Sequence, residues 1–179
     1  MLYDKANPWA VNTRTLVLCA IFGAMVIAMQ AAGIGSIPVP NLSGALTTLL
    51  IPVILGAVIG GPVVGMFAGL VMGVYYLILF PTFGPLTMIP SRLLFPLLAW
   101  LAHRALSGGN DLIAGAAAGA VGAVANTLLT IGAAVLQGQA PLSFLATVVP
   151  QAAVEAVAAA IIVPLVARAV GSAVSARGR

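Results

Sequence analysis

Two apolar segments joined by a glycine–proline turn decide the fold class of this chain. Residues 45–79 read ALTTLLIPVILGAVIGGPVVGMFAGLVMGVYYLIL and contain no charged side chain. Proline cannot continue a preceding helix but suits the first turn of the next one. The Gly60-Gly61-Pro62 triplet therefore predicts a tight turn, and the segment predicts a helical hairpin formed by residues 45–59 and 63–79.

The composition places this hairpin in a membrane. Of the 179 residues, 62% are hydrophobic and 6% are charged, whereas soluble domains carry about 25% charged residues. A membrane-spanning helix needs about 20 apolar residues, so the apolar region leaves no room for a soluble domain. We expect an all-α bundle of six transmembrane helices, with spans at residues 15–33, 45–59, 63–79, 91–106, 112–136 and 142–174.

Prolines mark the connections and the last span. Residues 34–44 and 80–90 each contain at least two prolines, and we expect both to be loops. The last span is too long for one straight crossing, and Pro150 and Pro164 are its expected kinks.

The basic residues predict the orientation. They flank alternate connections, and the positive-inside rule therefore places both termini in the cytoplasm. The chain then divides into a cytoplasmic segment (1–14), the membrane domain (15–174) and a basic cytoplasmic tail (175–179). The residues that set this pattern are Lys5, Arg14, His103, Arg104, Arg168, Arg177 and Arg179. The net charge of +4 does not indicate nucleic-acid binding, because no basic run with interleaved aromatic residues is present.

Polar and aromatic side chains gather in the outer half of the expected bundle. At 1.5 Å per residue, Gln30 and Asn126 lie about 24 and 22 Å from the cytoplasmic ends of their spans. Gln151 and Glu155 share a helix face at about 14 and 20 Å from the outer side. This asymmetry predicts a pocket open to the outside, closed by residues 34–44 and 80–90. Its expected members are Gln30, Tyr75, Tyr76, Arg92, Asn126, Gln151 and Glu155.

These polar residues also have structural interpretations. Gln30, Asn126 and Gln151 can form hydrogen bonds between helices, and Arg92 is either a snorkelling anchor or a functional group. Glu155 differs from these uncharged residues, because placing an ionisable group near mid-membrane costs about 2.5 kcal/mol or more in free energy. Such a group is usually retained for function. Arg92 is the cation that could pair with Glu155, although their expected depths differ.

Small residues recur at a spacing of four in two spans, where they let helix backbones approach closely. One stripe comprises Ala20, Ala24 and Ala28, and the other comprises Gly65, Gly69 and Gly73. We expect the glycine stripe to pack inside the bundle. The alanine stripe, on a first helix at the bundle edge, could contact another protein.

The sequence gives no sign of catalysis. It lacks HExxH, GxSxG, Walker A and CxxC motifs, and its three carboxylates cannot form a metal cage or a catalytic dyad because Asp4 and Asp111 lie at cytoplasmic edges. We therefore expect neither an enzyme nor a bound metal or cofactor. Uphill transport would need an ion gradient or ATPase subunits as partners.

The chain resembles the S-components of energy-coupling factor (ECF) transporters over about residues 15–170. Residues 37–73, IPVPNLSGALTTLLIPVILGAVIGGPVVGMFAGLVMG, resemble the family's proline-containing first loop, its Gly-Pro turn and its glycine-rich third helix. Pro90-Ser91-Arg92-Leu93-Leu94 is similar to the arginine-containing start of the fourth helix. Asn126-Thr127 resembles the polar pair of the fifth helix, and Glu155 an acidic residue of the sixth.

The resemblance implies a function and partners. S-components bind a water-soluble vitamin or related micronutrient near the outer face of the plasma membrane. They dock on a membrane T-component that carries two cytoplasmic ATPases. In that family a stripe of small residues on the first helix is the coupling surface, which assigns Ala20, Ala24 and Ala28 to partner contact.

Substrate identity stays open in the sequence. The tryptophan-rich site of thiamine binders and the Lys-Asn pair of riboflavin binders have no match in this sequence. The substrates that remain possible are a vitamin precursor, a pyridoxine-like compound, pantothenate and cobalamin.

Two other functions are alternatives to substrate binding by an S-component. A small secondary transporter or channel would need a polar path through the inner half, and an intramembrane enzyme would need a second catalytic group beside Glu155.

Overall fold

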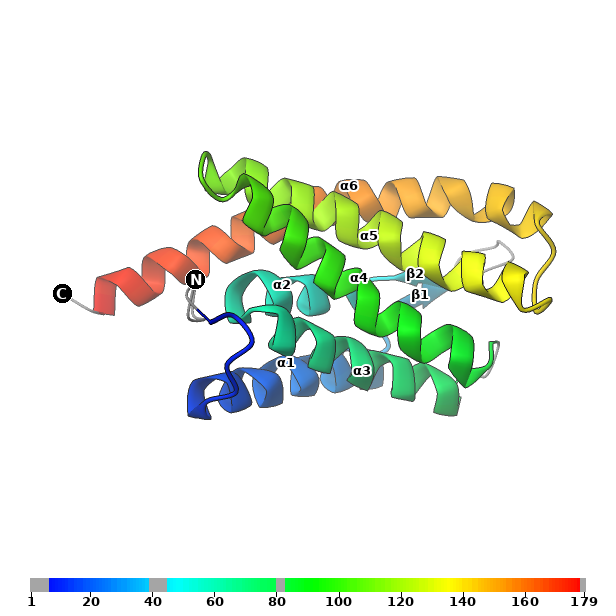
Figure 1. Cartoon of the computed structure of the whole chain (residues 1–179), viewed down its shortest axis with the longest axis horizontal. Helices are drawn as coiled ribbons and strands as arrows, with labels where there is room; N and C mark the ends of the chain where they lie inside the picture. The colour runs from blue at the N-terminus through cyan, green and yellow to red at the C-terminus, as the bar shows by residue number, and fades with distance from the viewer. Residues whose placement is uncertain (1–6, 39–44, 80–82, 178–179) are drawn as a thin grey trace.

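The computed structural model describes residues 7–38, 45–79 and 83–177, and in this part the chain forms six helices and one two-stranded sheet (Figure 1). The expected all-α class is confirmed. Asp4, Lys5 and Phe80 lie outside the described residues, as do parts of both expected loops and the last two residues of the chain. The elements are α1 (Thr13–Ala31), β1 (Ser36–Pro38), β2 (Ala45–Thr47), α2 (Leu50–Gly60), α3 (Pro62–Leu79), α4 (Pro85–Leu106), α5 (Asp111–Leu136) and α6 (Ser143–Arg177).

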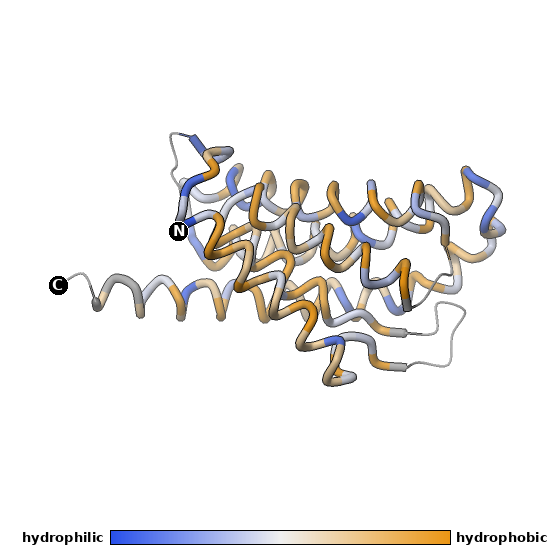
Figure 2. Tube along the Cα trace, turned by 90° about the horizontal axis from the view of Figure 1, so that it is seen from below, coloured by the Kyte–Doolittle hydropathy of each residue, from blue (hydrophilic) through white to orange (hydrophobic). Residues whose placement is uncertain are grey.

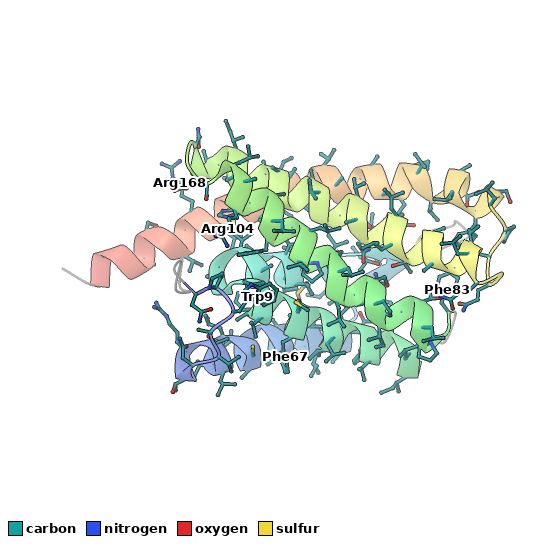
Figure 3. All side chains as sticks on the ribbon, in the orientation of Figure 1. Trp9, Phe67, Phe83, Arg104 and Arg168 are labelled. Carbon is teal, nitrogen blue, oxygen red and sulfur yellow. The ribbon has the colours of Figure 1, made fainter. Side chains whose placement is uncertain are left out.

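The helices run along one axis, so that the connections gather at two ends (Figure 1). Both termini lie at one end, together with the α2–α3 and α4–α5 turns, and we call this the terminal end. The β1–β2 hairpin and the α3–α4 and α5–α6 connections lie toward the other end, which we call the hairpin end. Figure 3 shows Arg104 and Arg168 near the terminal end and Phe83 at the hairpin end.

Apolar residues run along the outside of this bundle. Figure 2 shows hydrophobic residues over the whole length of the helices, and many large apolar side chains of α1, α5 and α6 are exposed. Four helices are long and apolar enough to cross a membrane, namely α1, α4, α5 and α6. The other two, α2 and α3, are shorter apolar helices.

The shortest helix, α2, is the centre of the fold. It contacts all five other helices, and every one of its residues except Ile51 is buried. Its 11 residues rise only about 16 Å, about half the thickness of a bilayer core. Because protein surrounds α2, it does not have to match the thickness of the lipid.

The chain before α2 forms a strand where we expected a helix. The expectation of a span starting at Ala45 is wrong there, because β2 pairs antiparallel with β1 and α2 begins only at Leu50. The register places Ser36 opposite Thr47. Residues 34–44, expected to be a loop, therefore contain a strand in their described part. A β-branched threonine suits such a pairing.

The fourth helix starts earlier than its prolines suggested. We expected a loop through Pro90, whereas α4 begins at Pro85 and contains Pro90 and Pro96 inside the helix. Pro85 lies in the first turn, where proline is favourable because its missing N–H would have no partner there. Neighbouring helices help a membrane bundle to tolerate interior prolines. In α6, Pro150 and Pro164 also lie inside the helix.

The glycine stripe packs inside the bundle, as expected. A side chain on Gly65 would overlap Ala57 of α2, and one on Gly69 would overlap the backbone carbonyl of Arg92 in α4. A Cβ on Gly73 would lie 3.1 Å from Cγ of Arg92. The stripe thus sets how closely α3 approaches α2 and α4, and it positions the backbone that carries Arg92.

This packing generates a stability prediction. Gly69→Ala should lower the free energy of unfolding by about 1–3 kcal/mol, because the new methyl group cannot fit beside the Arg92 carbonyl and α3 must move away from α4. Thermal unfolding of the purified protein in detergent measures this. The matched control is Gly132→Ala in α5, where nothing lies within 4 Å of the added Cβ. Equal melting temperatures for the two variants would show that α3 and α4 are not closely packed at Gly69.

Candidate functional site

Glu155 of α6 is a buried carboxylate, 3% exposed, about 18 Å along the helix from its first residue. Its Oε1 accepts a hydrogen bond from the backbone N–H of Thr47, at 2.7 Å, and another from Nε2 of Gln151, at 2.9 Å. The expected shared face of Gln151 and Glu155 is thus confirmed. The bond to Thr47 fixes the end of β2 against the first half of α6.

Arg92 of α4 points into the bundle rather than toward the membrane surface. It is 5% exposed, and its Nη1 donates to Oδ1 of Asn126 and, at 3.0 Å, to Oγ1 of Thr130. Thr130 in turn donates to the backbone carbonyl of Asn126 at 2.7 Å. The guanidinium carbon also lies 5.5 Å from the centre of the Tyr76 ring, within the range of a cation–π interaction. Three helices therefore fix this cation.

A chain of hydrogen bonds joins α1, β1 and α3. The hydroxyl of Ser36 donates to Oε1 of Gln30 at 3.1 Å and lies 2.6 Å from the hydroxyl of Tyr76. Because the same Tyr76 ring lies against Arg92, this chain continues to the cation.

The β1–β2 hairpin connects the groups around Arg92 with those around Glu155. Ser36 of β1 reaches Gln30 and Tyr76, and Thr47, its partner in the strand register, reaches Glu155. We call the whole set the polar cluster. Its members are Gln30, Ser36, Thr47, Tyr76, Arg92, Asn126, Thr130, Gln151 and Glu155.

The cluster contains six of the seven residues that the sequence pointed to. The exception is Tyr75, which is half-buried and makes no hydrogen bond with the cluster in the described part of the chain. Adjacent helical residues diverge by about 100°, so only one of the two tyrosines can face the cluster. Sequence reasoning missed Ser36, Thr47 and Thr130. The only available signal was that Thr130 follows Asn126 by one helical turn.

Comparison with known protein families matches residues 14–167 with the ECF transporter substrate-specific component. The chain belongs to this family. It is therefore a membrane-embedded, substrate-binding component of a transporter rather than an enzyme. No curated protein and no solved structure matches the chain.

The alanine stripe of this S-component lies on the outer side of α1. Ala20, Ala24 and Ala28 are all exposed, while Phe22 and Val26 of the same helix point into the core. The two stripes of small residues thus differ in position. The glycine stripe is covered by α2 and α4, and no described element of the chain covers the alanine stripe.

The hairpin end of the S-component holds two neighbouring connections together. Oε1 of Gln139, in the α5–α6 connection, accepts from the Gly84 N–H at 3.0 Å and from the Thr87 hydroxyl at 3.2 Å. The Phe83 and Phe144 rings meet edge to face at 6.4 Å. These contacts tie the start of α4 to the start of α6, the two helices that carry Arg92 and Glu155 further along.

At the terminal end, aromatic and basic side chains pack together. Trp9 meets Trp100 edge to face at 6.1 Å, and Arg104 lies 5.2 Å from the centre of the Trp100 ring. We expected His103 to serve as a charge at the membrane surface, but it is only 4% exposed. Among the described residues, no group of three His, Cys, Asp or Glu side chains could hold a metal ion.

Proposed function

We propose that this S-component binds a water-soluble vitamin or related micronutrient from outside the cell and delivers it by docking on an ATP-driven module in the plasma membrane. That module would be a membrane T-component carrying two cytoplasmic ATPases. The observation that supports substrate binding is the polar cluster, which places a carboxylate, a guanidinium and several hydrogen-bonding groups inside an apolar bundle. So costly a set of buried groups is typical of a binding site in a membrane protein.

We propose distinct tasks for the members of the cluster. Glu155 is the polar anchor of the substrate, with Gln151 and Asn126 as further hydrogen-bonding groups. Gln30 and Arg92 complete the polar wall, and one tyrosine, Tyr76 rather than Tyr75, stacks against a ring of the substrate. The position of Tyr76 beside Arg92 supports this choice.

The exposed alanine stripe supports docking on a T-component. Ala20, Ala24 and Ala28 follow each other along one side of α1, and their small side chains allow another helix backbone to approach closely.

We propose six membrane crossings with both termini in the cytoplasm. Both termini lie at the terminal end, and Arg14, Arg104 and Arg168 are exposed, as the positive-inside rule requires for a cytoplasmic end. Reporter fusions after residue 179 and within residues 107–110 should report the cytoplasm, whereas a fusion within residues 137–142 should report the outside. An external C-terminus, or the same side for both connections, would contradict this topology.

Ala24→Trp should abolish both uptake and co-purification with the T-component, because a large ring prevents close approach of a partner helix. The affinity of the isolated S-component for its substrate should stay nearly unchanged. The matched control is Val124→Trp, at an exposed position of α5, and this variant should retain uptake. If Ala24→Trp weakens substrate binding but leaves assembly intact, the stripe serves internal packing instead.

Glu155→Gln should weaken substrate binding about ten- to a hundredfold, since a hydrogen bond to a charged group contributes roughly 1.5–3 kcal/mol. Glutamine can still accept from the Thr47 amide, so the fold should persist. The ligand is first identified by mass spectrometry of molecules that co-purify, and calorimetric titration then gives the affinities. Asp111→Asn, which removes an exposed carboxylate at the terminal end, is the control. If Glu155→Gln and Asn126→Ala both bind the substrate normally but lose thermal stability, the two side chains have a purely structural role.

A further inference from the structure

Arg92 is a buried cation that no carboxylate of the described residues contacts directly. Its two hydrogen bonds are both made by Nη1, and both acceptors, Asn126 and Thr130, are uncharged. Its Nε is buried and has no hydrogen-bond partner. Buried polar groups in proteins are nearly always hydrogen-bonded, so an unpartnered guanidinium nitrogen requires an explanation. Removing a charge from water without a counter-ion is costly.

Glu155 does not serve as the direct counter-ion. The two charges interact through space, but among the described residues no carboxylate oxygen lies within 4.0 Å of the Arg92 guanidinium. Oε1 of Glu155 is already held by Thr47 and Gln151. The carboxylate is thus directed toward the hairpin and α6, while the guanidinium is directed toward α5.

One edge of the Arg92 guanidinium makes no hydrogen bond with the described residues. Asn126 and Thr130 hold Nη1, and the Tyr76 ring lies against the guanidinium. The opposite edge, formed by Nε and Nη2, is one of the two edges on which a guanidinium binds a carboxylate or phosphate through two parallel hydrogen bonds. Its orientation is fixed in advance by three side chains.

We infer that the substrate carries an anionic group, a carboxylate or a phosphate, and that this group binds to the Nε edge of Arg92. The inference rests on the proposed function and narrows it. Of the substrates that the sequence leaves open, it favours an acid such as pantothenate over uncharged pyridoxine. Arg92 would then select the substrate by its negative charge, and Glu155 would accept hydrogen bonds from donors on the substrate.

The test compares acids with their neutral counterparts on the purified full chain. The probes are pantothenate with panthenol, nicotinate with nicotinamide, biotin with biotinamide, and pyridoxal phosphate with pyridoxal, alongside thiamine, riboflavin and cobalamin. We expect an acid to bind most tightly, and its neutral counterpart to bind at least about a hundredfold more weakly. A difference in affinity within the pyridoxal phosphate pair indicates that the site binds a phosphate, and a difference within one of the other three pairs indicates a carboxylate.

Two variants test the role of Arg92. Arg92→Gln should lower the affinity for the acid about a hundredfold and leave that for the neutral counterpart within about threefold. Asn126→Asp places a carboxylate beside Nη1 of Arg92, and this carboxylate should compete with the acid for the guanidinium. The affinity for the acid should therefore fall at least about tenfold. This variant tests Arg92 even if Arg92→Gln does not fold. The matched control is Arg104→Gln, at an exposed position of the same helix outside the polar cluster, and this variant should bind as the wild type does.

The possible failures are distinguishable. If a neutral or cationic micronutrient binds at least as tightly as every acid, the anionic substrate is wrong while the proposed substrate-binding function stands. If an acid binds best but neither Arg92→Gln nor Asn126→Asp weakens it, another residue recognises the anion. If no probe binds and no small molecule co-purifies, the proposed function fails as well.

Discussion

Burial of α2 on every side is the constraint on which the other elements depend. A helix exposed to lipid must extend across the hydrocarbon, because unpaired backbone groups cannot face lipid. Since α2 is enclosed by the other five helices, it can be only 11 residues long, and the chain before it can form a strand. The hairpin then occupies the length of the bundle that a longer helix would have filled.

The hairpin makes a polar cluster possible between helices that are otherwise apolar. Helices satisfy their own backbone groups and offer only side chains to a buried carboxylate. A strand edge also offers backbone N–H groups, and Thr47 uses one to bind Glu155. The opposite residue, Ser36, joins Gln30 and Tyr76. Two strands of three residues thus connect α1, α3 and α6, and movement of the hairpin would alter the surroundings of both Glu155 and Tyr76.

Small residues act in opposite ways on the two sides of the molecule. Gly69 and Gly73 bring α3 against the backbone and side chain of Arg92, so close packing supports the cation that α5 holds through Asn126. On α1, Ala20, Ala24 and Ala28 form an exposed line of small side chains, with larger exposed apolar residues such as Ile21 and Met25 beside it. One stripe is covered by other helices and positions Arg92, and the other is exposed.

The sequence by itself determined the all-α class, the membrane location, the family and six residues of the cluster. These follow from composition, from proline and glycine positions, and from the rarity of polar side chains in apolar helices. Only the tertiary structure decided that α2 is short and central, that α4 begins at Pro85, and that Tyr76 rather than Tyr75 joins the site. The reason is that a helix apolar on all sides has no sequence pattern to show which face meets protein and which meets lipid. The partners of Arg92 and the pairing of Ser36 with Thr47 likewise depend on segments distant in the chain.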